Sequence, residues 1–407
     1  MRTTYFEVNI PKALVTKALR PVWPGVVWSP LSPSRVTTLP EPSLPGPRWI
    51  RVRNRQCGIC ATDLTLLFVE ADPQVSMAAL PGLARFYLGH EVVSDVVETG
   101  PEVTAVRVGD RVIMDTRHTG PTCFSQEISP PCQHCSVGEY ARCENQSNGA
   151  GPAGVGGGWG DGYTAHETEV WRLPPDLTDD QAVLTEPASV ALRAVLRQRP
   201  EPGERVLIIG CGIIGLLTVG VARIVAPQAH ITAMARYSHQ AQMARRLGAD
   251  EVIAGGDAYG EIARTTGGHL YEGALGNKML LGGYDVIYDV VGTGQTIKDS
   301  LRWARAGGTV VVVGISPKLL KTDLSPVWHQ EVNLVGSIVH GMEDWNGRRM
   351  HGYDLVSQWM QAGVLSTADL ITHRYPFHEY KKAVATATDK RTGAIKVVLQ
   401  MGRDTDA

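Results

Sequence analysis

Three short segments of this 407-residue chain carry side chains that commonly bind zinc. The segment CGICATD contributes Cys60, YLGHEV contributes His90, and VLTEPAS contributes Glu186. Thiolate, imidazole and carboxylate are all zinc ligands, and three protein ligands with one open position define a catalytic zinc. A zinc of this kind acts as a Lewis acid on a substrate oxygen. The three segments therefore indicate metal-assisted chemistry on an oxygen-bearing substrate.

Each of the three residues also has an ordinary structural explanation. Cys60 could be a buried structural thiol, which is a common fate of a lone cysteine. His90 could be a turn histidine, and Glu186, which precedes Pro187, could favour a helix N-terminus through its charge. Each explanation is reasonable for its own residue. The three together are less convincing, because all three segments precede or border one dinucleotide-binding pattern.

That pattern is the segment RVLIIGCGIIGLL, in which Gly210, Gly212 and Gly215 have the G-x-G-x-x-G spacing. It follows an apolar strand and precedes a helix whose first residues are Ile213 and Ile214. A motif of this spacing indicates a dinucleotide site only when it stands between a strand and a helix. The three glycines would allow a tight turn, close approach of a pyrophosphate, and packing of helix on strand. The helix N-terminus would then bind the phosphates. A glycine-rich turn without a ligand is the alternative.

The residues at the end of the next strand indicate which nicotinamide cofactor is used. An NAD site usually has an acid there, about 20 residues further on, which binds the ribose 2′-hydroxyl. This chain has Ala235 followed by Arg236 instead. Alanine leaves room for a 2′-phosphate, and arginine supplies a bidentate cation. We therefore predict NADP(H) in preference to NAD(H); the alternative is that Arg236 is a solvated surface residue.

Charge and cysteine usage exclude several function classes. The formal net charge is −2 and no long basic run occurs, so neither a nucleic acid nor an acidic membrane surface is favoured as a partner. The N-terminal residues lack a signal-peptide pattern, and the most apolar stretch, residues 206–222, is too short for a membrane span. Seven clustered cysteines without a secretion signal favour metal binding and a reducing, cytoplasmic environment.

The length of the chain predicts two domains. Residues 1–60 have the composition of short antiparallel strands, and the first region is predicted to form a small β-rich barrel. From about Pro187, helices alternate with apolar strands, which is typical of an α/β, doubly wound parallel sheet. We predict a β-rich domain from residues 1–187 and 335–407, with the doubly wound domain inserted at 188–334.

The motifs GICATD, GHE, TEPASVALRAV and GCGIIG stand in the order found in zinc-dependent medium-chain alcohol dehydrogenases. From about residue 12 to residue 402 the chain resembles this family, and most of all its polyol, threonine and glucose dehydrogenase branch. The resemblance implies a GroES-like catalytic domain with a Rossmann domain between its two parts. It also implies an alcohol or carbonyl substrate and a homo-dimer or homo-tetramer.

The resemblance assigns roles by position. The implied catalytic zinc ligands are Cys60, His90 and Glu186, with Glu91 as a further candidate that binds directly or through water. Thr62 is the implied acceptor of the substrate proton, and Asp63 the acid that orients a ligand. Gly314 and Lys396 are implied neighbours of the cofactor, and Lys396 also of the Glu91 carboxylate.

One position departs from the liver-type enzymes of the family. They have a histidine as proton exit three residues after the proton acceptor, where this chain has Thr65. The outer proton relay is therefore expected to run through water or another group.

The family often carries a structural zinc held by four cysteines, and the segment PPCQHCSVGEYARC resembles that lobe. Cys132, Cys135 and Cys143 keep the family spacing, but Ser129 stands where the first cysteine is expected. Cys123 lies nine residues before Cys132, and a longer loop costs little closure entropy. We predict that Cys123 completes a closed structural zinc site. Free thiols, or a Cys132–Cys135 redox pair, are the alternatives.

The segment DTRHTG borders the substrate pocket in the family. Its polar residues Asp115, Thr116, Arg117 and His118 favour a polyol-like or sugar-like substrate, unless they face solvent. Three other classes remain open: a zinc-free NADPH-dependent quinone or enoyl reductase of the same superfamily, a non-enzymatic NADPH-binding protein, and a zinc-ribbon nucleic-acid module. The ligand set disfavours the first two, and a single tight cysteine pair disfavours the third.

Overall fold

A computed structural model describes residues 1–75, 84–115, 120–146 and 151–402. The chain forms two compact units, each considered separately below: Met1–Glu186 with Asp369–Ala407, and Pro187–Ala368. The second unit extends further than the 188–334 expected from the sequence, because a hairpin and a helix after residue 334 pack with it. No helix among the described residues has both the length and the apolar character needed to cross a bilayer.

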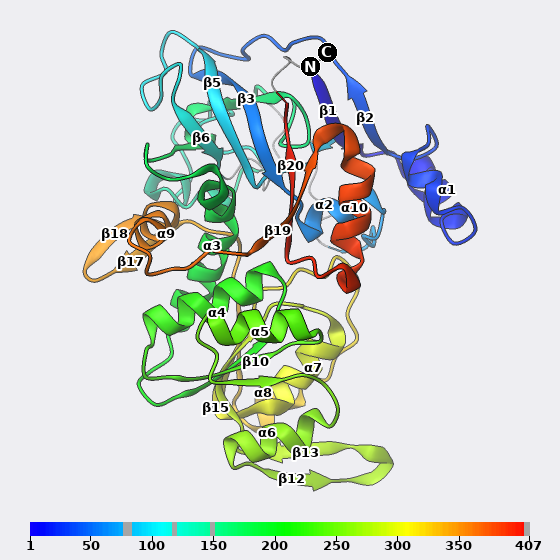
Figure 1. The fold of residues 1–407 in the computed structure, drawn as a ribbon, viewed down its shortest axis with the longest axis vertical. Coiled ribbons are helices and arrows are strands. Elements are labelled where there is room, and N and C mark those ends of the chain that lie inside the picture. Colours follow the sequence, from blue (N-terminus) through cyan, green and yellow to red (C-terminus); the bar gives the residue numbers. More distant parts are fainter. Residues whose placement is uncertain (76–83, 116–119, 147–150, 403–407) are drawn as a thin grey trace. The chain divides into compact units, whose positions relative to one another are not determined.

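The first unit is built on a seven-stranded sheet with the order β19-β20-β3-β5-β6-β8, in which β7 also pairs with β3. These strands are β3 (Trp49–Gly58), β5 (Val92–Thr99), β6 (Arg111–Met114), β7 (Gly162–His166), β8 (Val170–Arg172), β19 (Ile371–Pro376) and β20 (Lys396–Gln400). Strand β20 pairs with β3 although more than 300 residues separate them, and Figure 1 shows the two side by side. The C-terminal segment therefore belongs to the first unit.

Helices and short turns flank this sheet. They are α2 (Ala61–Leu67), η4 (Cys135–Val137), η5 (Tyr140–Arg142), η6 (Glu167–Glu169), η8 (Phe377–Glu379), α10 (Tyr380–Thr388) and η9 (Lys390–Thr392). Helix α3 (Asp179–Arg197) begins in the first unit and continues into the second from Pro187. Apolar residues of β3, β5 and β20, such as Ile50, Val92 and Leu399, form the core with α10. Burying these side chains is the main stabilising contribution that holds the β-rich unit together.

The N-terminal residues form a separate small sheet with the order β2-β1-β4. Its strands are β1 (Arg2–Glu7), β2 (Ser34–Thr38) and β4 (Arg85–Tyr87), and α1 (Ile10–Leu19) and η1 (Pro24–Trp28) connect β1 to β2. The prediction that residues 1–60 form only strands and turns is therefore wrong for α1. Asn9 caps this helix by accepting the N–H of Lys12, and Pro11 fits its first turn.

The second unit contains a six-stranded parallel sheet with the order β11-β10-β9-β14-β15-β16. Its strands are β9 (Arg205–Ile209), β10 (His230–Met234), β11 (Glu251–Ile253), β14 (Tyr284–Asp289), β15 (Ala304–Val312) and β16 (Asn333–Gly336). Helices α4 (Ile213–Val225), α5 (Ser238–Arg246), α6 (Ala258–Thr266), α7 (Gly294–Trp303) and α8 (Ser325–His329) accompany them. The strand order reverses beside β9, which confirms the predicted doubly wound fold.

Two hairpins extend the second unit. Strands β12 (His269–Glu272) and β13 (Lys278–Leu281) form the first around η7 (Ala274–Gly276), and β17 (Met342–Trp345) and β18 (Arg348–His351) form the second. Helix α9 (Gly352–Gln361) follows β18.

Candidate active site

Cys60, His90 and Glu91 come together in the first unit. Cys60 follows β3 and is the N-cap of α2, while His90 and Glu91 occupy the turn that leads into β5. One ligand atom of each residue lies within 4.8 Å of the other two. His90 is 7% exposed and Glu91 is 1% exposed. A partly exposed thiol, a buried imidazole and a buried carboxylate within this distance fit a zinc ion that a substrate can reach.

Asp63 fixes two of these residues in place. Its carboxylate accepts the backbone N–H of Cys60 at 3.2 Å and that of Gly89 at 2.8 Å, and its Oδ1 lies 3.6 Å from His90 Nδ1. Burial raises the pKa of Asp63, but the neighbouring His90 and these hydrogen bonds outweigh burial and lower it. Since Nδ1 faces Asp63, the other ring nitrogen is the one available to a metal.

Lys396 neutralises the Glu91 carboxylate inside the protein. Its Nζ lies 2.6 Å from Glu91 Oε1 and 3.2 Å from the carbonyl oxygen of Ile59, and the Lys396 side chain is 1% exposed. Burial alone would lower the pKa of Lys396. The charges of Glu91 and Cys60 outweigh burial, so the pKa of Lys396 is raised above its usual value. Gly58 makes this arrangement possible, because a Cβ there would lie 2.0 Å from Glu91 Oε2.

Glu186 lies in α3 and is 5% exposed, but it does not belong to the group of ligand atoms within 4.8 Å. Burial raises its pKa to about 7, with His90 opposing this rise and Glu91 adding to it. The helix begins at Asp179, so Glu186 and Pro187 stand inside it. The alternative explanation of Glu186 as a residue at a helix N-terminus is therefore wrong.

Thr62 is exposed in the first turn of α2, and its Oγ1 lies 3.6 Å from Cys60 Sγ. Thr65, one turn later, is partly buried. The hydroxyl expected to receive a proton is therefore beside the metal-binding group and in contact with solvent.

The glycines between β9 and α4 have the conformations that a dinucleotide requires. Gly210 has a φ of +96°, which favours glycine, and a Cβ on Gly215 would lie 1.7 Å from the carbonyl oxygen of Gly210. Gly212, the N-cap of α4, has open space where its Cβ would be. Ile213 and Ile214 form the first turn of α4, where backbone N–H groups point outward.

A second turn at the same edge of the sheet was missed by the sequence analysis. Asp289, at the end of β14, accepts the N–H groups of Val291 at 3.0 Å and Gly292 at 2.9 Å. A Cβ on Gly314, which follows β15, would lie 2.5 Å from the Gly292 nitrogen, so the two loops are in contact. The feature of the sequence that could have revealed this turn is the segment DVVG, residues 289–292, at the end of a buried strand.

The end of β10 keeps the features from which NADP(H) was predicted. Ala235 is buried, and Arg236 is exposed. Within the described part of the chain, the Arg236 guanidinium has no hydrogen-bond or ion-pair partner. It is therefore available to an anionic ligand.

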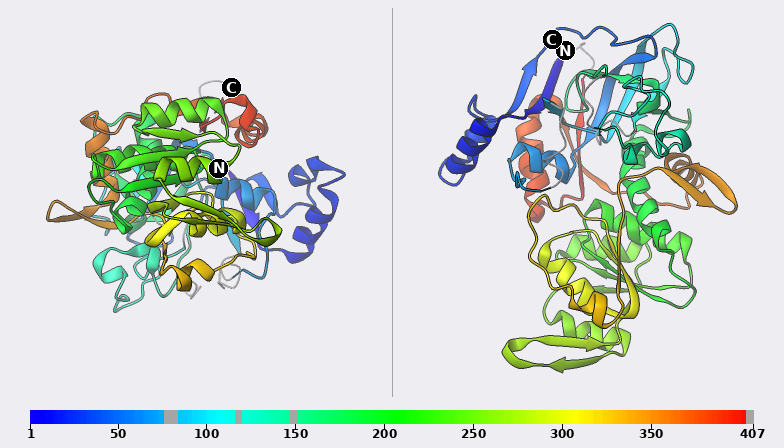
Figure 2. Two further views of the ribbon diagram at one scale, coloured as in Figure 1. Left: turned by 90° about the horizontal axis from the view of Figure 1, so that it is seen from below. Right: turned by 180° about the vertical axis from the view of Figure 1, so that it is seen from behind.

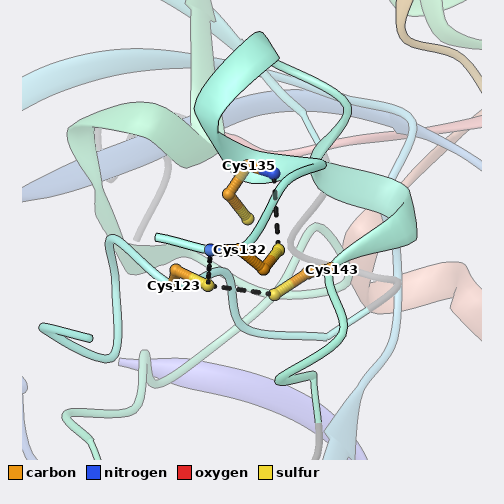
Figure 3. Close-up of side chains that lie close together, drawn as sticks. All are labelled: Cys123, Cys132, Cys135 and Cys143. Carbon is orange, nitrogen blue, oxygen red and sulfur yellow. Dashed lines mark hydrogen bonds between the residues drawn. The ribbon is translucent and has the colours of Figure 1, made fainter. Parts of the chain in front are cut away.

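The four predicted cysteines Cys123, Cys132, Cys135 and Cys143 also meet, with their sulfur atoms within 4.8 Å of one another (Figure 3). Cys123 Sγ lies 3.7 Å from Cys143 Sγ and accepts the backbone N–H of Cys132 at 3.3 Å. Cys132 Sγ accepts the N–H of Cys135 at 3.5 Å. Burial raises the pKa of Cys132, but backbone N–H groups outweigh it and lower the pKa to about 6, which favours a thiolate.

The segment that borders the predicted substrate pocket is described only in part. Asp115 follows β6 and is 5% exposed, and burial with the nearby charges of Glu169 and Glu186 raises its pKa to about 8. Thr116, Arg117 and His118 lie outside the described residues.

The chain is similar in sequence to known protein families and to characterised enzymes. The sequence model of the alcohol dehydrogenase GroES-like domain matches residues 46–175, and that of the zinc-binding dehydrogenases matches residues 214–350. D-arabinitol dehydrogenase 1 of Uromyces fabae is 28% identical over 81% of this chain and 83% of its own. Sorbitol dehydrogenase of Arabidopsis thaliana is 27% identical over 88% of this chain and 89% of its own.

Solved structures show the same fold. The crystal structure of 2R,3R-butanediol dehydrogenase from Bacillus subtilis is 25% identical, covers 90% of this chain and 96% of its own, and has a TM-score of 0.68. A zinc-binding dehydrogenase from Sinorhizobium meliloti 1021, solved bound to NADP, is 25% identical over 90% and 95% of the chains, with a TM-score of 0.67. This chain belongs to the zinc-dependent medium-chain alcohol dehydrogenase family, with a GroES-like domain, a Rossmann domain, zinc and a nicotinamide cofactor, and it is an oxidoreductase that acts on an alcohol.

Proposed function

We propose that this protein transfers a hydride between NADP(H) and the alcohol or carbonyl carbon of a polar, polyol-like substrate. The first unit is the catalytic domain in this proposal, and the second unit binds the coenzyme. The observation that carries it is the group of Cys60, His90 and Glu91, whose ligand atoms lie within 4.8 Å of one another and which Asp63 and Lys396 fix in place. A zinc-free reductase would have no use for this set of donors.

Zinc bound here supplies a Lewis acid for the substrate oxygen, and the nicotinamide accepts or supplies the hydride. Asp63 orients the His90 ring, and Lys396 balances the charge of the Glu91 carboxylate. Thr62 takes the proton of the substrate hydroxyl and passes it to water, because its own hydroxyl is exposed. Because the proton passes from Thr62 directly to water, this route does not require an ionisable side chain at position 65.

Two buried carboxylates, Glu91 and Glu186, are candidates for the third zinc ligand. The sequence favoured Glu186, whereas the geometry favours Glu91, which lies closer to Cys60 and His90. We expect Glu91→Gln to lower the zinc affinity of the site by about 10–100-fold or more, and Glu186→Gln to lower it less. Zinc titration of both variants against a competing chelator tests this expectation. A larger loss in Glu186→Gln would instead identify Glu186 as the ligand.

NADP(H) preference is supported by the exposed, unpaired Arg236 beside the buried Ala235. A charge-assisted hydrogen bond contributes about 1.5–3 kcal/mol. We therefore expect Arg236→Ala to lower kcat/KM for NADP⁺ by about 10–100-fold and to leave kcat/KM for NAD⁺ nearly unchanged. Initial rates with each coenzyme measure both effects. Equal or better kcat/KM with NAD⁺ in the unmodified protein would refute the preference.

A structural zinc held by Cys123, Cys132, Cys135 and Cys143 is the second metal of the proposal. The N–H groups that already point at these sulfur atoms would stabilise thiolates. We expect two zinc ions per chain, and one in Cys123→Ser, measured by elemental analysis of the purified protein. An unchanged count would exclude Cys123 as a ligand. Cys211→Ala, a buried cysteine of the second unit, is the control and should keep both ions.

A polyol-like substrate is supported by the named activities of the relatives and by the buried Asp115, a group suited to hydroxyl recognition. A screen of alcohols, polyols, sugars and their carbonyl forms with NADP⁺ and NADPH tests the substrate class. Turnover of apolar alcohols alone would contradict the polar class.

Self-association is part of the proposal. Strand β16 is an edge strand, and its Leu334 and the nearby Trp328 of α8 are 42% and 74% exposed. An exposed edge with apolar side chains favours pairing with another chain. We propose a homo-oligomer that uses this edge.

A further inference from the structure

The glycine-rich segment GVGGGWGDG, residues 154–162, lies in the first unit. A run of glycines is typical of an exposed, flexible loop, yet residues 156–160 are all buried. The backbone N–H and carbonyl groups of a buried segment need partners inside the protein. The partners that this segment has therefore show what it holds in place.

Two of these partners stand directly before His90, the imidazole ligand of the zinc site proposed above. The N–H of Gly158 donates to the carbonyl oxygen of Gly89 at 2.8 Å, and the N–H of Trp159 donates to that of Leu88 at 2.9 Å. Glycine-rich loops that bind phosphate direct their N–H groups at the anion. Here these N–H groups are used by the turn that carries His90, so the segment supports that turn and does not bind a phosphate.

The same turn is held on its other side as well. The N–H of Gly89 donates to Asp63 Oδ1 at 2.8 Å, and the N–H of Leu88 donates to the carbonyl oxygen of Thr4 at 3.0 Å. Thr4 belongs to β1, the dark-blue strand that starts at the N-terminus in Figure 2. Every backbone N–H and carbonyl group of Leu88 and Gly89 therefore has a partner. The position of the next residue, His90, is fixed by these four hydrogen bonds.

The glycines allow the segment to pack against the turn without intervening side chains. A Cβ on Gly157 would lie 2.6 Å from the carbonyl oxygen of Leu88, and a Cβ on Gly158 would lie 2.5 Å from Cys57 Sγ. Such distances are too short for a real side chain, so only glycine fits at either position. The backbone of the segment thus contacts β3 and the turn directly. A displacement of the segment would displace the turn.

Asn54 fixes the shape of the segment. Its Nδ2 donates to the carbonyl oxygen of Gly157 at 2.9 Å and to that of Gly160 at 2.8 Å. Its Oδ1 accepts the hydroxyl of Ser94 at 2.9 Å, and Asn54 is 4% exposed. A side-chain amide has two N–H groups, and the segment uses both. Asn54 therefore ties both ends of residues 157–160 to β3, the strand that leads to Cys60.

We propose that Asn54 is a positioning residue for the reaction, which sets the place of the His90 imidazole through residues 157–160. Its amide holds the segment, the segment holds the turn, and the turn carries the ligand. Because Asn54 and Cys60 are joined by β3, this chain of contacts refers two zinc ligands to the same strand. The inference rests on the zinc site of the proposed function.

The test is the release of zinc from full-length, zinc-loaded protein to a graded series of chelators. Asn54→Leu keeps the branched shape of the side chain and removes its hydrogen bonds. We expect it to weaken zinc binding at Cys60 and His90 by about 10–100-fold, the usual effect of a lost residue that orients a ligand. Cys60→Ser identifies which step of the release belongs to this site. The release from the four-cysteine site and the coenzyme Kd are expected to stay unchanged.

Circular dichroism shows at which temperature each variant is folded, and the release is measured there. A role in folding alone would lower the melting temperature and leave the release unchanged. If Asn54→Leu does not fold, Ser94→Ala replaces it. Ser94→Ala frees only one side of the Asn54 amide, so we expect it to weaken zinc binding by about 2–10-fold, the effect of one lost hydrogen bond.

Gln56→Leu is the matched control. Gln56 is a second buried amide on β3, 5% exposed, and its Nε2 has no hydrogen-bond partner in the part of the chain that the structure describes. This variant should release zinc as the unmodified protein does. Unchanged release from folded Asn54→Leu, or from Ser94→Ala where it stands in, would overturn the proposal alone. Equal release from the unmodified protein and Cys60→Ser would instead overturn the zinc site of the proposed function, and this inference with it.

Discussion

Cys60→Ser is expected to lower kcat by about 10³-fold or more and to remove one zinc ion from each chain. A catalytic zinc contributes several kcal/mol of charge stabilisation in the transition state, and each 1.36 kcal/mol is a factor of about ten in rate. Serine cannot replace the thiolate as a zinc ligand at neutral pH, because its hydroxyl stays protonated. Elemental analysis and initial rates with the best substrate measure both losses.

The control is Cys57→Ala, three residues earlier on β3. Cys57 is fully buried, its sulfur donates to the Gly58 carbonyl oxygen at 3.3 Å, and it is not part of the ligand group. Burial raises the pKa of Cys57 well above its usual value, so its thiol stays neutral. This variant should keep both zinc ions and most of its activity. Equal losses in the two variants would mean that Cys60 acts through packing and not through the metal.

The second large effect concerns the buried ion pair of Lys396 and Glu91. Lys396→Met is expected to destabilise the protein by about 3–5 kcal/mol, because the Glu91 carboxylate would remain as an uncompensated buried charge. The two side chains are each 1% exposed, so water cannot replace the lost ammonium group. Thermal unfolding of metal-free protein measures this effect, since a bound cation would compensate for part of the loss.

Two further variants separate the ion pair from other roles of Lys396. In the Lys396→Met, Glu91→Gln double variant the buried charge is gone, and part of the stability should return. Lys382→Met removes a lysine that pairs with Glu379 at the surface, where Lys382 is 70% exposed. Exposed pairs contribute about 0–1 kcal/mol, so this control should change stability little. If Lys396→Met lowered stability as little as Lys382→Met does, the Lys396–Glu91 pair would not be shielded from water.

The parts of the fold that could be predicted are those that local sequence determines. Runs of apolar residues such as VLIIG form buried parallel strands wherever helices alternate with them, and the glycines after β9 are required by the turn itself. Cys123 was predicted as a ligand because the family resemblance implies four cysteines, and Ser129 stands where the first of them is expected. The meeting of Lys396 with Glu91 followed from the family resemblance.

The rest depended on contacts between distant segments. The proximity of Glu91 to Cys60 and His90 depends on Gly58, whose missing side chain leaves room for the carboxylate, and no local pattern reports that. Helix α3 begins eight residues before Pro187 because Asp179 is held there by Arg55 and Arg111, each at 2.6 Å. Helix α1 was missed because the residue that this helix buries is the polar Thr16, so the sequence shows no apolar stripe that faces a core.

The most direct test of the account is turnover before and after removal of the metal. NADP⁺ reduction is followed at 340 nm with a polyol substrate, first in zinc-loaded protein, then after chelation, and again after zinc is returned. The account predicts turnover in the first state, almost none in the second, and recovery in the third. Full turnover by protein that elemental analysis shows to be free of metal would contradict the role of Cys60, His90 and Glu91.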